Sequence, residues 1–149
     1  MNDSSGQPAA LTVLESVLYC DDLSAAEAFY REVLGLAFVS RRPGRHVFFR
    51  AGGSMVLIFN AAATSAGPTV VSGQDVPAHG ARGAGHLAFR LAEPAFQAWR
   101  HRLEARGVAI ESEVCWPGGG RSLYFRDPAG NSLELATADI WGLSEVERG

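Results

Sequence analysis

The chain has 149 residues, of which 47% are apolar and 19% are charged, and its formal net charge is −3. This length suffices for one large domain or two small modules. The interspersed charges argue against nucleic-acid binding, which needs a basic surplus or stripe, and no apolar run approaches membrane-spanning length.

Residues 1–10, MNDSSGQPAA, lack the basic and apolar regions of a signal peptide, so we expect a disordered lead-in and a cytoplasmic protein. Cys20 and Cys115 lie far apart and form neither a metal-binding spacing nor a disulfide framework. We therefore expect two buried or half-buried free thiols in a reducing compartment.

Residues 11–60 predict a first βαβββ module. The segment 11–19 has the length and apolar content of a strand. Ser24 and Glu27 match a capping box, which predicts a helix over 24–34 that ends at Gly35. Glycines separate three further expected strands, 37–41, 45–50 and 54–59.

Residues 61–83 are rich in alanine, glycine, serine and proline and show no sustained period, so they predict a long linker. The order of elements then repeats in a second module, 84–137, followed by a C-terminal tail over 138–149. The elements expected in this module are a strand at 85–92, a helix at 93–106 and strands at 108–115, 121–126 and 131–136. The predicted fold class is α+β.

Three side chains from these strands form a candidate metal site. Alternation along the strands places His86 and Glu134 on the face opposite to the leucines that should pack on the helix. Glu15 occupies in the first module the place that His86 occupies in the second. If the modules pair about a pseudo-twofold axis, these side chains converge in one cleft. Two carboxylates and one imidazole suit a divalent Mn, Fe, Co, Ni or Zn ion.

Three segments resemble the module signatures of the vicinal-oxygen-chelate superfamily, which includes glyoxalase I, extradiol dioxygenases, fosfomycin-modifying enzymes and bleomycin-resistance proteins. The segments are YCDDLSAAEAFYREVLGL (19–36), GHLAFR (85–90) and SLYFRDPAGNSLELAT (122–137). The resemblance covers roughly residues 11–137. It implies two paired βαβββ modules whose sheets curl around a central metal or ligand cleft.

The resemblance carries the metal positions of the superfamily onto Glu15, His86 and Glu134, and it implies one divalent ion per site. Glu134 is also the candidate general base. A fourth position, acidic or polar in glyoxalase-like members, falls in SMVLIF (54–59), where Val56 or a neighbour fills it. Glutamate in place of the frequent first-strand histidine also departs from the dioxygenase and fosfomycin patterns.

The implied function is that of a metal-dependent, glyoxalase-like lyase or isomerase acting on a small molecule that chelates through adjacent oxygens. The alternative is a bleomycin-resistance-like protein that sequesters a natural product without chemistry. An extradiol dioxygenase is less favoured because the chain lacks its set of two histidines and one carboxylate. The aliphatic fourth position also predicts inefficient turnover of the hemithioacetal of methylglyoxal and glutathione.

Further ligand contacts are expected from aromatic, aliphatic and histidine side chains of the cleft. These candidates are Phe48, Val56, Ile58, His79, Trp116 and Tyr124. For His79, an exposed loop position is the competing interpretation. We also expect a homodimer, because open sheet edges need covering and twofold symmetry is the commonest closed arrangement. Whether the modules pair within a chain or between chains is left open.

Overall fold

Each half of the chain folds into a four-stranded sheet with the same strand order. The computed structural model describes residues 6 and 8–143. The first sheet has the order β1-β4-β3-β2. Its strands are β1 (Glu15–Tyr19), β2 (Ala37–Arg42), β3 (His46–Ala51) and β4 (Ser54–Phe59). The second has the order β7-β10-β9-β8. Its strands are β7 (His86–Arg90), β8 (Ser112–Cys115), β9 (Arg121–Arg126) and β10 (Ser132–Ala136).

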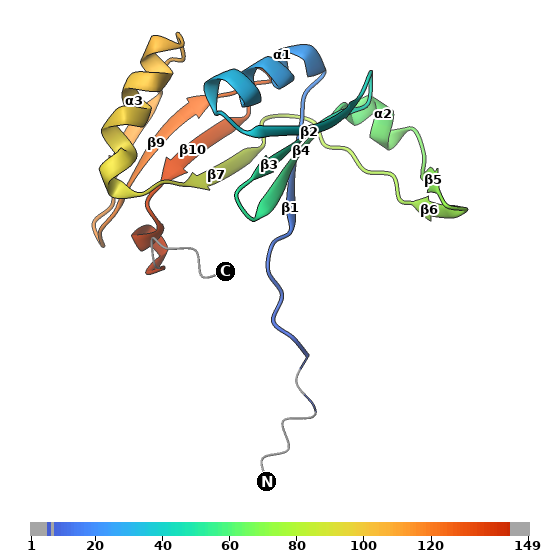
Figure 1. Ribbon diagram of the computed structural model, residues 1–149, viewed down its shortest axis with the longest axis horizontal. Helices are drawn as coiled ribbons and strands as arrows, with labels where there is room; N and C mark the ends of the chain where they lie inside the picture. The colour runs from blue at the N-terminus through green and yellow to red at the C-terminus, as the bar shows by residue number, and fades with distance from the viewer. Residues whose placement is uncertain (1–5, 7, 144–149) are drawn as a thin grey trace.

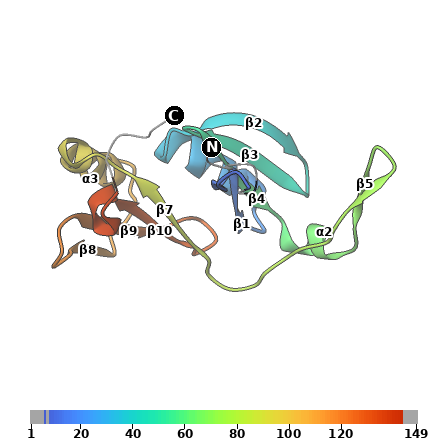
Figure 2. The same ribbon diagram turned by 90° about the horizontal axis from the view of Figure 1, so that it is seen from below.

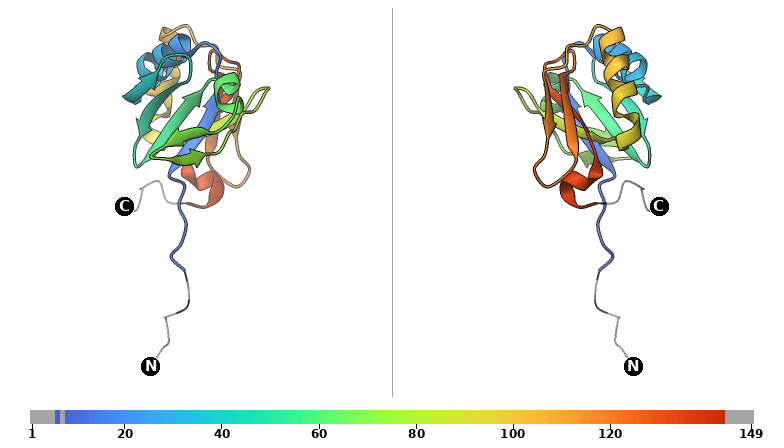
Figure 3. Two further views of the ribbon diagram at one scale, coloured as in Figure 1. Left: turned by 90° about the vertical axis from the view of Figure 1, so that its right-hand side faces the viewer. Right: turned by 90° about the vertical axis from the view of Figure 1, so that its left-hand side faces the viewer.

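The helices of both modules lie together on one side of the sheets (Figures 1 and 3). In the first module, α1 (Leu23–Ala28) continues into the π-helical η1 (Phe29–Val33). In the second, the 3₁₀ turn η2 (Glu93–Ala95) leads into α3 (Phe96–Ala105). This arrangement confirms the predicted α+β fold of two βαβββ modules, although the sheets are not closed into a barrel.

One apolar core is shared by the two modules. It contains side chains from the helices and from both sheets, among them Tyr30, Phe49, Phe96, Phe125 and Leu133, all of which are fully buried. Burial of such large side chains is the main stabilising term of the fold.

Hydrogen bonds also tie the modules together. The Tyr30 hydroxyl donates to Asp127 Oδ2 at 2.7 Å. The Asn131 amide donates to the Tyr19 carbonyl at 3.1 Å, and Arg102 Nε donates to the Val33 carbonyl at 2.7 Å. The relative position of the modules is therefore set by directional contacts as well as by apolar packing.

The first helix begins differently from the prediction. Asp22 is the N-cap, and its carboxylate accepts a hydrogen bond from the Ala25 N–H at 3.0 Å. Ser24, the predicted cap, lies inside the helix. From Phe29 the helix widens into η1, where the Leu34 N–H donates to the Phe29 carbonyl five residues back. The helix prediction was right, but the capping residue was wrong because an earlier side-chain oxygen reaches the first turn.

The expected linker contains regular structure, which corrects the prediction of a plain connection. It holds α2 (Ala61–Ser65), which Asn60 caps, and a hairpin of β5 (Thr69–Val71) and β6 (Gln74–Val76). Ser72 and Gly73 both have positive φ, as the tight turn of a two-residue hairpin requires. Figures 1 and 2 show this segment projecting away from the two sheets.

The segments at the ends differ from the predictions in detail. Of the expected lead-in, residues 1–5 and 7 lie outside the described residues, as do 144–149 of the tail. The tail begins with a 3₁₀ turn, η3 (Ala138–Trp141). Cys20 is buried as expected, but Cys115 is exposed because it ends the edge strand β8. Within the described part of the chain, no helix is long and apolar enough to cross a membrane.

Candidate functional site

The candidate ligands lie on the face of each sheet that is turned away from the helices, which we call the open face. In β10, Leu133 and Leu135 belong to the core, so the alternating Glu134 points to the open face. In β7, Leu87 and Phe89 pack against the core, and His86 points away from it. The predicted assignment of His86 and Glu134 to one face agrees with this packing.

The structure brings His86 and Glu134 together. Their atoms Nε2 and Oε1 are 3.2 Å apart. β7 and β10 are parallel neighbours with His86 opposite Ser132, so Glu134 lies two residues further along the adjacent strand. The other imidazole nitrogen, Nδ1, lies 2.9 Å from the Ser132 carbonyl oxygen. Glu134 is buried, whereas the His86 side chain is half exposed.

These contacts test whether the pair suits a cation. A carbonyl oxygen only accepts, so His86 Nδ1 carries a hydrogen and donates it to Ser132. In the neutral imidazole the lone pair of Nε2 then faces a carboxylate oxygen. Two such acceptors at 3.2 Å are favourable only with a proton or a cation between them. The donor pair of imidazole nitrogen and carboxylate oxygen therefore fits a divalent transition-metal ion.

Three further side chains border the pair on the open face. Ser122 Oγ donates to Glu134 Oε2 at 2.5 Å, and the Trp116 indole N–H donates to Ser122 Oγ at 2.9 Å. Tyr124 lies opposite Glu134 in the antiparallel β9–β10 pair, and its ring stacks at 6.3 Å from that of His86. Burial and then the Glu134 carboxylate raise the pKa of Tyr124, so its phenol stays protonated at neutral pH. Ser122 was missed by the sequence analysis, although its alternation with Leu123 in SLYF places it on the same face.

Glu15 does not join this pair within the chain. It is the first residue of β1 and is exposed, and it lies opposite Met55 of β4 as His86 lies opposite Ser132 of β10. Its position thus repeats that of His86 in the other module. Across residues 6 and 8–143, however, no three histidine, cysteine, aspartate or glutamate side chains gather closely enough to hold a metal ion.

The residue equivalent to Glu134 in the first module is Leu57. It lies two positions beyond Met55, as Glu134 lies two beyond Ser132. Val56 and Ile58 alternate with it and are buried in the shared core, on the opposite face from the candidate metal ligands. The prediction placed Val56 or a neighbour at the fourth position, and the strand register, which sequence period alone does not give, selects the neighbour Leu57.

The remaining predicted contacts lie on the open faces. Phe48 stacks on His46 with ring centres 3.9 Å apart and contacts Phe59 at 5.3 Å. His79 packs its ring against Phe59 at 4.8 Å, and its Nδ1 lies 2.7 Å from the Tyr19 hydroxyl. His79 is thus anchored on the first module and does not belong to the Glu134 pair. Trp116 and Tyr124 border that pair directly.

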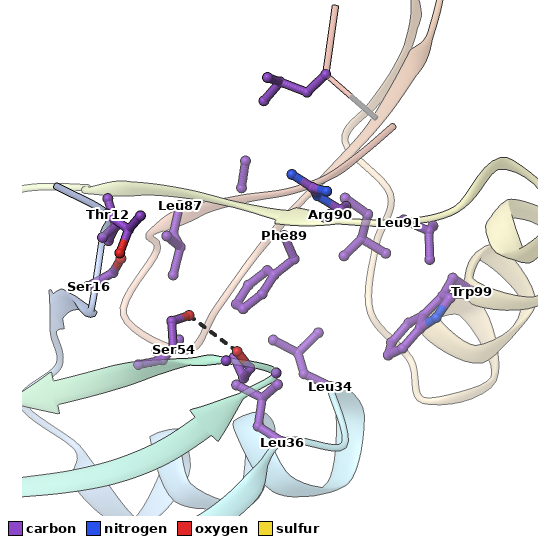
Figure 4. A pocket seen from close by; sticks show the side chains of 18 of the residues that line it. Thr12, Ser16, Leu34, Leu36, Ser54, Leu87, Phe89, Arg90, Leu91 and Trp99 are labelled. Atoms are coloured by element: carbon purple, nitrogen blue, oxygen red, sulfur yellow. Dashed lines mark hydrogen bonds between the residues drawn. The ribbon is translucent and has the colours of Figure 1, made fainter. Parts of the chain in front are cut away.

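A groove of about 1280 Å³ lies between the modules. Leu87 and Phe89 of β7 both point into it, Phe89 towards Leu34, and Trp99 of α3 lies at one end (Figure 4). Neither His86 nor Glu134 lines it. The candidate site and this apolar groove are therefore separate features.

Comparisons with known proteins agree with the fold. The family model of the Glyoxalase/Bleomycin resistance protein/Dioxygenase superfamily matches residues 12–135. The crystal structure of a lactoylglutathione lyase from Agrobacterium tumefaciens is 41% identical, with a TM-score of 0.81, over 93% of this chain and 100% of that one. No match is found among curated protein sequences.

Two other solved structures are more distant. A glyoxalase/bleomycin resistance protein/dioxygenase from Nocardioides is 26% identical, with a TM-score of 0.67, over 98% of this chain and 95% of that one. TioX from Micromonospora sp. ML1 is 21% identical, with a TM-score of 0.65, over 85% and 98%. The likeness to TioX concerns the fold alone.

Proposed function

The chain belongs to the Glyoxalase/Bleomycin resistance protein/Dioxygenase superfamily, and we propose that it is a metal-dependent, glyoxalase-like lyase or isomerase. Its substrate is a small molecule that chelates through adjacent oxygens. One observation carries this proposal: His86 Nε2 and Glu134 Oε1 face each other at 3.2 Å with no hydrogen-bonding hydrogen between them in the neutral imidazole. A divalent ion such as Ni, Co, Zn, Mn or Fe suits that pair.

Glu15 is the proposed third ligand, supplied by a second copy of the chain. It is exposed on the open face of the first module, at the place equivalent to His86. In a twofold dimer, the first module of each chain can lie against the second module of the other. Two equivalent sites then form, each with all three ligands. Large apolar side chains that lie exposed near both ends of the described chain support burial in such an interface. They are Leu11, Val13, Leu14, Trp141 and Leu143.

The chain's own residues have distinct parts in this proposal. Glu15, His86 and Glu134 would hold the divalent ion, which would supply Lewis-acid polarisation of the substrate's oxygens. The Ser132 carbonyl holds the imidazole in one tautomer and orientation. Glu134 is the candidate base for a proton on the carbon next to those oxygens. Tyr124 and Trp116 border the space where the substrate lies.

Metal binding tests the site directly. Titration calorimetry of the metal-free protein with Ni²⁺ is expected to give about one ion per chain. Binding is lost in His86→Ala and in Glu134→Gln, and it persists in the control His101→Ala, since His101 is exposed on α3. Unchanged binding in His86→Ala contradicts the proposal.

Mixing two inactive variants tests whether the site is shared. Glu15→Ala and His86→Ala each destroy every site of their own dimer. After mixing and exchange of subunits, half of the dimers carry one intact site, so about one quarter of the metal sites return. A site formed within one chain returns none, and a monomeric mass in light scattering also contradicts the shared site.

Sequestration of a natural product is the second candidate function. The observation that favours it is the exposure of aromatic side chains on both open faces, with Trp116 40% exposed and Phe48 and Tyr124 partly exposed. Such rings offer stacking surfaces for a planar ligand. Tight binding of an aromatic compound by metal-free protein, without turnover when metal is supplied, favours this function over catalysis.

The similarity to a lactoylglutathione lyase makes the glutathione hemithioacetal the natural first substrate to assay. Leu57, where an acidic residue stands in glyoxalase-like members, argues for another substrate with a larger apolar part. We further propose a cytoplasmic location, which the two free cysteines support.

A further inference from the structure

The Glu134 oxygen that does not face His86 is held by a series of hydrogen bonds that reaches the surface. The Trp116 indole N–H donates to Ser122 Oγ at 2.9 Å, and Ser122 Oγ donates to Glu134 Oε2 at 2.5 Å. Glu134 Oε1, the other oxygen, is the one that faces His86. The two oxygens of one carboxylate therefore have different partners.

The donors and acceptors in this series of hydrogen bonds follow from the chemistry of Trp116, Ser122 and Glu134. An indole N–H only donates, so Ser122 Oγ must accept from Trp116. Its single hydrogen then points to Glu134, and a hydroxyl–carboxylate distance of 2.5 Å falls in the range of charge-assisted hydrogen bonds. Ser122 is fully buried and Glu134 is 5% exposed, so water does not replace this contact.

Trp116 is itself fixed by its turn. Its backbone N–H donates to the Gly120 carbonyl at 2.9 Å, and the Gly119 N–H donates back to the Trp116 carbonyl at 3.0 Å. Gly120 has a φ of +83°, and a Cβ there would lie 2.5 Å from Asp139 and 2.6 Å from Ile140. The turn 116–120 thus requires glycine and holds the indole over the open face of β9.

We propose that Ser122 and Trp116 are positioning residues, which hold Glu134 Oε2 so that Oε1 alone is presented beside His86. The part of this inference that concerns metal rests on the proposed function. It predicts that Glu134 binds a metal ion through one oxygen, and that loss of the Ser122 hydroxyl loosens the carboxylate without removing it.

Metal affinity gives the first test, with Ni²⁺ titrated into the metal-free full chain. Ser122→Ala is expected to weaken Ni²⁺ binding about 10- to 100-fold. Ser122→Thr keeps the hydroxyl and is expected to bind Ni²⁺ with the affinity of the wild type. Ser112→Ala, in an exposed position of β8, is the matched control and leaves the affinity unchanged. Equal affinities for wild type and Ser122→Ala overturn the proposal.

A second test needs no metal. The chain has three tryptophans, so its nitrogen-15 spectrum shows three indole N–H signals, and Trp116→Phe identifies the one that belongs to Trp116. Glu134→Gln is expected to shift this signal through Ser122, and Ser122→Ala to speed its exchange with water. The signals of Trp99 and Trp141 stay in place.

The two tests separate the two proposals. If the wild-type protein binds no metal, the proposed function fails, and the indole signal still decides whether Ser122 and Trp116 position Glu134. A Trp116 signal that Glu134→Gln leaves unmoved overturns the positioning role. A signal that moves, together with weaker metal binding in Ser122→Ala and its restoration in Ser122→Thr, supports it.

Discussion

Gly85, the residue before His86, lies against Leu18 of the other module. A Cβ at this position would lie 2.9 Å from Leu18 Cδ2 and 3.3 Å from Asn131 Oδ1. Leu18 is buried, and the Asn131 oxygen already accepts the Gly85 N–H at 2.8 Å. The absence of a side chain is therefore needed for close approach of β1 and β7.

We predict that Gly85→Ala lowers the free energy of unfolding by about 1–3 kcal/mol, the usual cost of overpacking. Urea denaturation measures this change. Gly53→Ala is the matched control, because a Cβ there meets nothing within 4 Å, and its effect should stay within about 0.5 kcal/mol. If both variants changed the free energy of unfolding by the same amount, the contact of the added Cβ with Leu18 would not be destabilising.

His46 is the residue for which the structure predicts an effect of pH on stability. Its ring stacks on Phe48, and its Nδ1 is buried with no hydrogen-bond partner among the described residues. Burial, and then the nearby Arg45 and Arg42, lower the pKa of His46 in the folded protein. Below about pH 6.5 the His46 imidazole binds a proton in the unfolded chain more readily than in the folded protein. The folded protein therefore loses stability as the pH falls.

Replacing His46 by phenylalanine keeps the stacked ring and removes the proton-binding nitrogen. We predict that the loss of stability between pH 7.5 and about pH 5.5 is smaller in His46→Phe than in the wild type. Urea unfolding at the two pH values measures it. His101→Gln is the control, since His101 is exposed and should leave the pH slope unchanged. Equal slopes in all three proteins would contradict the predicted role of His46.

At the scale of elements, the start of α1 shows that the sequence pattern of a capping box at Ser24 did not identify the residue that caps the helix. Asp22 accepts from the Ala25 N–H, whereas Ser24 lies exposed within the first turn. We predict that Asp22→Ala costs about 1 kcal/mol of unfolding free energy, as loss of an N-cap does. Thermal or urea unfolding measures this cost. Ser24→Ala should change stability by less than about 0.5 kcal/mol, and the reverse order of effects would restore the predicted capping box.

The strands show which of their properties can be predicted from sequence and which cannot. The alternation of Leu133 and Leu135 with Glu134 assigned the faces of β10, and the packing agrees with it. The expected strand at 108–115 was too long, because only Ser112–Cys115 finds a partner in β9. A strand's faces follow from its own residues, whereas its length depends on how far it stays paired with its neighbour, and β9 continues beyond the last pair, Ser112 with Tyr124.

At the scale of the whole molecule, the substrate is tested by one assay. The register places Leu57 where Glu134 stands in the other module, so the first module offers no second acidic group at that position. We predict negligible turnover of the hemithioacetal of methylglyoxal and glutathione with Ni, Co, Zn or Mn supplied in turn. A kcat/KM of about 10⁴ M⁻¹s⁻¹ or more would show that the acidic group is dispensable.

Much of the candidate site was open to prediction from sequence. The pattern of their strands indicated that His86 and Glu134 point away from the helices, and the repeated order of elements related Glu15 to His86. These features are local, because the period of a strand and the turns DPAGN and PGGG depend on neighbouring residues only.

The sequence alone determined the two βαβββ modules and the faces on which the candidate ligands lie. Only the tertiary structure decided that His86 meets Glu134, that Ser122 holds the carboxylate, that Leu57 rather than Val56 is its counterpart, and that Glu15 stays apart. The physical reason is that register and module packing depend on contacts such as Tyr30 with Asp127, made between residues far apart in the chain.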